Sequence, residues 1–411
     1  MKKMLFGRYD YAAFAMFAAY AAVTVAIPTV LPQLAEALGF PLEAGGTMKA
    51  GWLAMTRNLV ICMSLVASGF IAGRWGNRRP LGVALMLVVA GMLACSVAPA
   101  YAVLLMALVV TGAGEGIVEG LGTPFVQGLH EKESGRYMNF SHGFWSFGVI
   151  AATLLFGWLV FRGVSWRVIL ALAAVFALVP MTLLLAPRRE GATRYPERAE
   201  KPSARRVAAQ AGEIAREPRF WVFFCAMIFA GGAEIGITFW VPSMVKLMFG
   251  GTAMQGGAAL AIFGAGMFAG RTGYGFVLHQ RHLKGLVIAT GCLAAIVCVF
   301  IPALARSDLP WKLHALYALL FVAGLGAAPH WPSIQTYAVE KMPHLDATMV
   351  FVMLSCAGVP GSGLMTLIIG WVGKPENLGL ENALYIIPVC FAVMVTFMLA
   401  ERIAEKLRVE S

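Results

Sequence analysis

Charged residues are scarce in this chain of 411 amino acids. Lys, Arg, Asp and Glu together make up 13% of it, while apolar residues reach 59%. That charged share is about half of what soluble proteins carry. So apolar a chain is neither an ordinary soluble domain nor a disordered one, and the composition predicts an integral membrane protein.

Sequence patterns of metal, nucleotide and catalytic sites are also missing. The seven cysteines stand singly, with no C-x-x-C spacing for zinc, haem or redox chemistry. The sequence has no nucleotide-binding loop, no cluster of metal ligands and no catalytic-triad spacing. We therefore expect the cysteines to pack, and we expect no cofactor, no bound metal and no enzymatic activity.

Long apolar runs fill most of the chain. Each is about 20 residues long, enough for a helix across a hydrocarbon core of about 30 Å. The twelve runs fall near residues 11–38, 48–72, 81–98, 101–128, 138–161, 166–186, 220–248, 254–278, 284–305, 311–338, 346–371 and 381–401. The first exceeds the apolar core of a secretory signal, so we expect it to remain as a transmembrane helix. The pattern predicts an all-α integral membrane protein with twelve transmembrane helices.

One long polar stretch, residues 187–219, separates the sixth run from the seventh and carries nine Lys or Arg against five Glu. We interpret it as a linker between an N-terminal six-helix half, residues 1–186, and a C-terminal half, residues 220–411. Within it, Ser203 is placed to cap a short amphipathic helix on the membrane surface. The apolar face of that helix would consist of Val207, Ala211 and Ile214.

Basic residues gather in alternate loops. Of the 32 Lys and Arg residues, 23 fall on the side of the two termini, seven on the other side and two within the runs. The positive-inside rule then places both termini and the linker in the cytoplasm of a multi-pass inner (cytoplasmic) membrane protein. The net charge of +11 is thus a signal of topology, and we expect no nucleic-acid partner.

The two halves repeat the same small motifs at nearly constant offsets. The matching pairs are Pro32 with Pro242 at an offset of 210, Gly112–Gly114 with Gly324–Gly326 at 212, and Gly157–Trp158 with Gly370–Trp371 at 213. Constant offsets indicate a duplicated six-helix unit, and so two pseudo-symmetric halves. Transporters use such halves to alternate access to a site at their interface.

On these features the chain resembles the major facilitator superfamily over essentially its whole length. Residues 69–79 read Gly-Phe-Ile-Ala-Gly-Arg-Trp-Gly-Asn-Arg-Arg, similar to the glycine and arginine motif that the family carries after its second helix. Gly73 stands where the family usually has Asp, and His279 stands there in the second copy. The resemblance implies the major facilitator fold, a transport function and a monomer in the lipid bilayer.

A narrower resemblance is to the fucose permease-like sugar:proton symporters. It rests on residues 119–126 (Glu-Gly-Leu-Gly-Thr-Pro-Phe-Val), 144–148 (Phe-Trp-Ser-Phe-Gly) and 232–236 (Gly-Ala-Glu-Ile-Gly). It implies that Glu119 carries the proton. Trp145 replaces the asparagine with which that group contacts sugar.

Ionisable residues within the apolar runs mark the expected working interior. An ionised group at bilayer depth costs about 2.5–3.5 kcal/mol on insertion scales, so it persists where it lines a polar cavity or meets a partner. Glu115 and Glu119 are four residues apart, on one helical face, where burial and mutual repulsion favour the neutral form of one carboxyl. The residues expected to couple protons are Glu119, Glu115 and Glu234. The alternative is a static network in which Glu115 and Glu119 pair with Arg57, and Arg271 is expected to snorkel or to bond between helices.

Aromatic and polar residues in the same runs supply candidates for substrate binding. Rings beside hydrogen-bonding groups suit sugars, aromatic solutes and cations alike. The candidates are His142, Trp145, Trp240, His330, Trp331, Gln335 and Tyr337.

Together the features predict a secondary active transporter that takes up a small polar, sugar-like solute with protons. Two alternatives remain open: proton-driven export of an amphipathic or drug-like compound, and a non-transporting receptor or assembly factor on the same fold.

Overall fold

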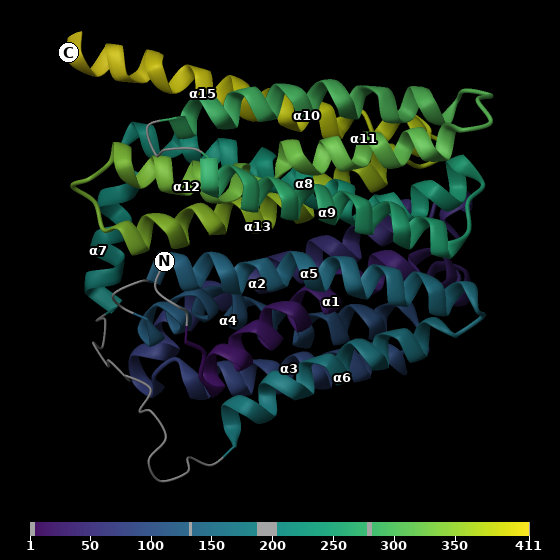
Figure 1. The fold of residues 1–411 in the computed structure, drawn as a ribbon, viewed down its shortest axis with the longest axis horizontal. Coiled ribbons are helices and arrows are strands. Elements are labelled where there is room, and N and C mark those ends of the chain that lie inside the picture. The colour runs from purple at the N-terminus through teal and green to yellow at the C-terminus, as the bar shows by residue number, and fades with distance from the viewer. Residues whose placement is uncertain (1–4, 131–133, 187–203, 278–281, 411) are drawn as a thin grey trace.

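The computed structural model describes residues 5–130, 134–186, 204–277 and 282–410, and these form helices joined by short loops. Among them, twelve helical segments are long and apolar enough to cross a membrane, as predicted. The helices lie side by side in two layers, with the N-terminal and C-terminal halves above one another (Figure 1). The bounds in the first half are α1 Arg8–Ala37, the short 3-10 helix η1 Leu42–Ala44, α2 Thr47–Trp75, α3 Arg78–Ser96, α4 Tyr101–Leu129, α5 Ser134–Phe161 and α6 Trp166–Leu185.

The second half follows a short connecting helix. Its bounds are α7 Ala204–Ala215, α8 Pro218–Phe249, α9 Ala253–Val277, α10 Leu283–Ala305, α11 Lys312–Ala327, α12 His330–Lys341, α13 Ala347–Val372, α14 Gly379–Ala383 and α15 Ile386–Glu410. We call the end of the bundle where α1 begins and α15 ends the terminal end, and the other the distal end (Figure 1).

The tenth predicted span differs from a single helix. It consists of α11 and α12, which are separated at Ala328 and Pro329. Proline has no backbone N–H to continue the ladder, and it disfavours helical geometry in the residue before it. The two pieces still follow one line across the bundle, so the count of twelve spans is unchanged.

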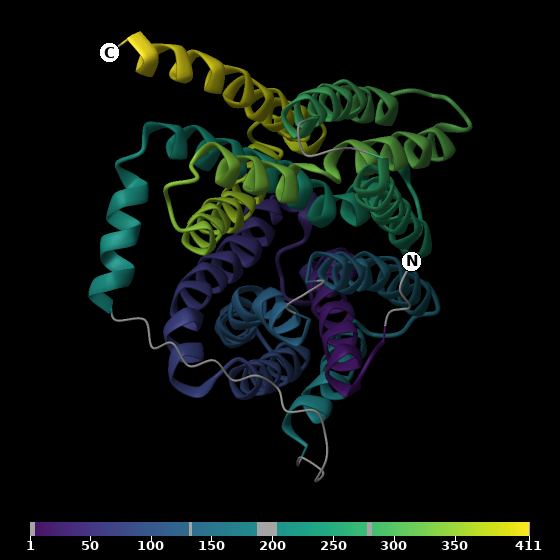
Figure 2. The same cartoon turned by 60° about the vertical axis from the view of Figure 1, so that its left-hand side comes forward.

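The short helix predicted in the linker is present as α7. Its apolar face turns toward the protein: Ile214 is buried, and α7 contacts α8 and α13. Figure 2 shows α7 standing apart from the main bundle at the terminal end. Ser203 and His279, which the sequence singled out, lie outside the described residues.

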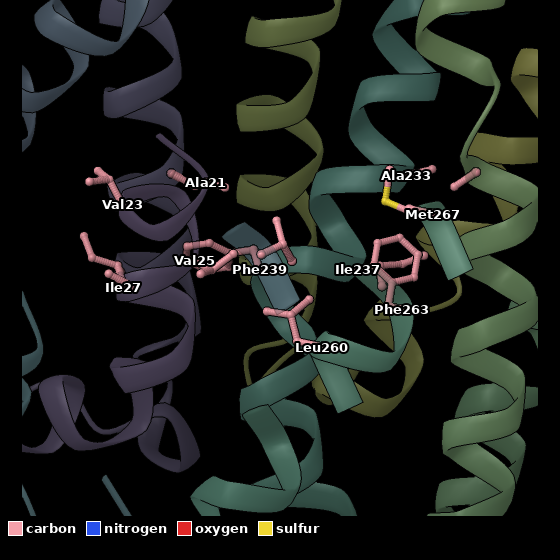
Figure 3. Packing of buried hydrophobic residues seen from close by; sticks show 14 of the residues in the cluster. Ala21, Val23, Val25, Ile27, Ala233, Ile237, Phe239, Leu260, Phe263 and Met267 are labelled. Atoms are coloured by element: carbon pink, nitrogen blue, oxygen red, sulfur yellow. The ribbon is translucent and has the colours of Figure 1, made fainter. Parts of the chain in front are cut away.

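Contacts between the halves follow three helix pairs: α1 with α8, α2 with α13, and α5 with α9. Figure 3 shows part of this packing, with Val25 on α1 pointing toward Phe239 on α8, and Leu260 on α9 nearby. Glycines bring the backbones together along the other two pairs. A Cβ at Gly51 would lie 2.7 Å from Leu367 Cα, and one at Gly257 would lie 2.4 Å from the Thr153 carbonyl oxygen. Glycine is therefore required where the two halves meet.

The halves are closed against each other at the distal end. Lys246 Nζ lies 2.8 Å from Glu36 Oε1, and Thr47 donates a hydrogen bond of 2.7 Å to the Gly370 carbonyl. In contrast, α4 and α12 pack mainly within their own halves in the described part of the chain. The Lys246–Glu36 and Thr47–Gly370 contacts thus join the two halves at the distal end.

The contact between α2 and α13 predicts a cross-link. Cys62 Sγ on α2 lies 3.9 Å from the Cys356 carbonyl oxygen on α13, so the two cysteines are neighbours across the seam. We expect copper–phenanthroline to oxidise this pair, because disulfides form between cysteines whose Cα atoms lie within about 7 Å. After cleavage at a protease site inserted between residues 187 and 203, the halves should then migrate together until a reductant is added. Cys62→Ser must abolish the cross-link; separate halves in the oxidised native chain would contradict the α2–α13 pairing.

Candidate functional site

Arg57 on α2 and Glu115 on α4 form a bidentate ion pair inside the N-terminal half. Arg57 Nε lies 2.6 Å from Glu115 Oε2, and Nη2 donates to the other carboxylate oxygen. Nη2 also lies 3.1 Å from Thr24 Oγ1 on α1. Glu115 is fully buried and the Arg57 side chain is 15% exposed. Two parallel charge-assisted hydrogen bonds satisfy both groups, so this pair is a structural connection between α1, α2 and α4.

Glu119, one turn further along α4, has different surroundings. Its carboxyl group lies near the Tyr20 hydroxyl of α1, and it is partly exposed. The charged groups that face it are Arg271 from α9, Glu234 from α8 and Glu115 from its own helix. The structure thus separates two glutamates that share one helical face: Glu115 is held by Arg57, whereas Glu119 faces the centre.

Arg271 on α9 connects three helices of both halves. Its Nη2 lies 3.3 Å from Glu234 Oε1 on α8, and its Nε lies 3.4 Å from the Ala328 carbonyl. The guanidinium carbon lies 5.2 Å from the ring centre of Trp145 on α5, a cation–π distance. Arg271 therefore bonds between helices, which was one of the two roles expected for it.

His142 lies one turn before Trp145 on α5. Its Nε2 lies 3.0 Å from Thr123 Oγ1 on α4, and its ring lies 4.5 Å from that of Phe17 on α1. These neighbours place it inside the bundle, yet the side chain is exposed. An exposed imidazole among α1, α4 and α5 must border an open space.

We call six residues the central cluster: five lie on α1, α5, α8 and α9, the helices along which the halves meet, and the sixth, Glu119, lies on α4. They are Tyr20, Glu119, His142, Trp145, Glu234 and Arg271. The cluster holds two carboxyl groups and a single guanidinium. With both carboxylates ionised and Arg271 charged, the cluster would carry one net negative charge.

The other predicted binding residues lie elsewhere in the C-terminal half. Trp240 is fully buried among Ile237, Leu320 and other apolar side chains. His330 is buried against Thr290 and Phe391, and the Tyr337 hydroxyl lies 3.2 Å from Glu401. The structure does not bring these three residues to the central cluster.

Gln335 and Trp331 pack along α12 and α13. Gln335 donates a 2.9 Å hydrogen bond to Ser355 Oγ, and Trp331 packs against Gly358. Neither contacts the central cluster through a described interaction. No group of three or more His, Cys, Asp or Glu side chains suited to a metal occurs among the described residues.

Sequence reasoning missed Tyr20 and undervalued Arg271. Tyr20 lies in a run of alanines and aromatics that carries no charge to draw attention to it. Arg271 stands after Gly270 in the terminal half of its helix, a position where an arginine can reach the membrane surface. The charges within the apolar runs could have identified Arg271. Three glutamates need cationic partners there, and Arg57 alone cannot pair with all of them.

Comparisons with known proteins agree on the family. The sequence profile described as Major Facilitator Superfamily matches residues 12–365. The cyanate transport protein CynX of Escherichia coli is 25% identical over 312 residues, which cover 73% of this chain and 73% of CynX.

Solved structures show the same fold. The fucose:proton symporter FucP of E. coli has a TM-score of 0.65 and 17% identity over 95% of this chain and 98% of its own. A D-xylose-proton symporter has a TM-score of 0.78 and 13% identity over 95% and 96%. At such identities these structures support the architecture and leave the substrate open.

Proposed function

The chain belongs to the Major Facilitator Superfamily, and on that premise we propose that it couples protons to the uptake of a small polar solute by alternating access. The observation that carries this proposal is the composition of the central cluster, in which two carboxyl groups, those of Glu119 and Glu234, lie near a single guanidinium, and only Glu234 contacts it directly. A carboxyl that gains a proton when the cavity opens to one side and loses it on the other is what such coupling requires.

Glu119 is the better candidate for the proton carrier within this proposal. Glu115 is committed to Arg57 by two hydrogen bonds, and Glu234 contacts Arg271 directly. Glu119 is partly exposed beside Tyr20, a neutral partner that can accept from the protonated acid and donate to the ionised one. It can therefore change charge without leaving an ion pair unmatched.

Alternating access is supported by where the halves touch. Rocking of one half against the other needs a seam that is closed at one end and open at the other. The Glu36–Lys246 and Thr47–Gly370 contacts close the distal end in this conformation. The Glu36–Lys246 pair is exposed, so separating it costs little free energy.

The names of similar proteins suggest which solutes to test. FucP and the xylose transporter are named for sugars, and CynX is named for cyanate, an anion. Reconstituted protein should therefore be tested with labelled L-fucose, D-xylose and cyanate under an inward acid gradient. Accumulation of any of them that a proton ionophore abolishes supports coupled uptake. Ionophore-sensitive efflux alone would favour an exporter, and binding without flux would favour a receptor.

We also propose that both termini and α7 face the cytoplasm, on the strength of the 23 basic residues on that side. A cysteine at Ala208 of α7, which is exposed, should resist an impermeant maleimide in intact cells and react after lysis. A cysteine at Glu376, whose side chain is 72% exposed at the distal end, is the matched control and should react in intact cells. The reverse labelling pattern would invert the topology.

A further inference from the structure

Arg271 offers an open hydrogen-bonding edge at the centre of the protein. Its Nε points to the Ala328 carbonyl at 3.4 Å and its Nη2 to Glu234 at 3.3 Å, both long for charge-assisted bonds. Within the described residues, Nη1 donates no hydrogen bond, and the side chain is 26% exposed. A guanidinium carries five N–H donors in a planar fork, so Arg271 retains unused donors that face open space.

Arg57 provides the comparison within the same chain. It is also an arginine within the membrane-spanning region, but Glu115 engages two of its nitrogens at short distance and Thr24 takes a further bond. The two arginines thus differ in how they bind a carboxylate. Arg57 forms a bidentate pair with Glu115, whereas Arg271 contacts Glu234 through one nitrogen only. That difference leaves Arg271 able to accept a second anion.

We propose that the transported solute is a small monoanion, such as a carboxylate, which binds the free edge of Arg271. This inference rests on the proposed function and names its substrate class. Trp145 covers one face of the guanidinium and Glu234 holds one nitrogen, so both act as positioning residues that leave the free edge accessible. Arginine suits this task because its fork matches the two oxygens of a carboxylate.

The charge balance of the cluster links this anion to a proton. With Glu119 and Glu234 ionised and Arg271 charged, the empty cluster carries one net negative charge. When a monoanion binds Arg271 and Glu119 takes up one proton, the net charge of the cluster is the same as before. One anion and one proton then enter together without net movement of charge, so a potassium diffusion potential set with valinomycin should leave uptake nearly unchanged.

The test uses matched pairs of anion and neutral amide on the purified full-length protein. Benzoate and acetate should raise the apparent melting temperature and bind by calorimetry, whereas benzamide and acetamide, which share their shapes, should not. Arg271→Gln should weaken carboxylate binding by about 10- to 150-fold. Arg271→Lys keeps the charge but not the fork and should give an intermediate loss. Arg306→Gln, an exposed arginine in a distal ion pair, is the matched control and should bind like wild type.

Two further outcomes separate this inference from the proposed function. If L-fucose or D-xylose binds, the carboxylates do not, and Arg271→Gln leaves sugar binding unchanged, the anion inference is overturned while coupled uptake of a neutral solute stands. If carboxylates bind through Arg271 but their uptake ignores a pH gradient, the anion site stands and the proton-coupled function falls. Because Arg271→Gln leaves Glu234 unpaired, the double variant Arg271→Gln, Glu234→Gln serves if the single variant does not fold.

Discussion

Glu119→Gln should abolish accumulation of solute driven by a pH gradient while leaving solute binding within about twofold of wild type. The amide keeps the shape and the hydrogen-bonding groups of the protonated acid, but it cannot release a proton. With one proton per solute, wild-type protein should accumulate solute about tenfold for each unit of pH difference, since one unit corresponds to 1.36 kcal/mol. The variant should only equilibrate the solute. The measurement is the inside-to-outside ratio of labelled solute in proteoliposomes.

The control is Glu381→Gln, which changes a half-exposed distal glutamate in the same way and should accumulate solute like wild type. If Glu119→Gln still accumulates solute in a pH-dependent manner, the proton carrier is another residue. Glu234 would then be the next residue to test. The only described partner of its carboxylate is Arg271, through a single 3.3 Å contact.

Glu115→Ala should reduce the free energy of unfolding by about 3–5 kcal/mol, because it leaves Arg57 charged and without its carboxylate in the membrane interior. The double variant Arg57→Met, Glu115→Leu should recover most of that loss, since an apolar pair of similar volume avoids the cost of burying charge. Reversible unfolding in mixed micelles provides the measurement. A Glu115→Ala protein as stable as wild type would mean that the pair is not structural, and Glu115 would return as a candidate for proton coupling.

The membrane architecture could be predicted from the sequence because hydropathy and length are local properties. Each run of about 20 apolar residues had only one stable outcome in a bilayer, and the predicted bounds agree with the helices to within a few residues at most ends. The break between α11 and α12 falls at Pro329, a residue that interrupts helices. The amphipathic pattern of residues 204–215 likewise predicted α7 correctly.

The central cluster could be predicted only in part, because it depends on which face each helix turns toward its neighbours. The four-residue spacing of Glu115 and Glu119 placed them on one face, but a turn of 5.4 Å puts one beside Arg57 and the other beside Tyr20. Trp145 and Arg271 are 126 positions apart and on different halves. No local pattern indicates that they stack, and no local pattern separates them from Trp240 or His330, which pack away from the centre.

Proton movement that accompanies solute entry tests the central claim most directly. Proteoliposomes in weak buffer, with no pH gradient and with the membrane potential clamped to zero, are given a solute that binds the purified protein, and the external pH is followed. The account predicts that the medium becomes alkaline as solute enters, with about one proton taken up per solute molecule, and that Glu119→Gln removes this signal. Solute entry through the wild-type protein at an unchanged external pH would contradict it.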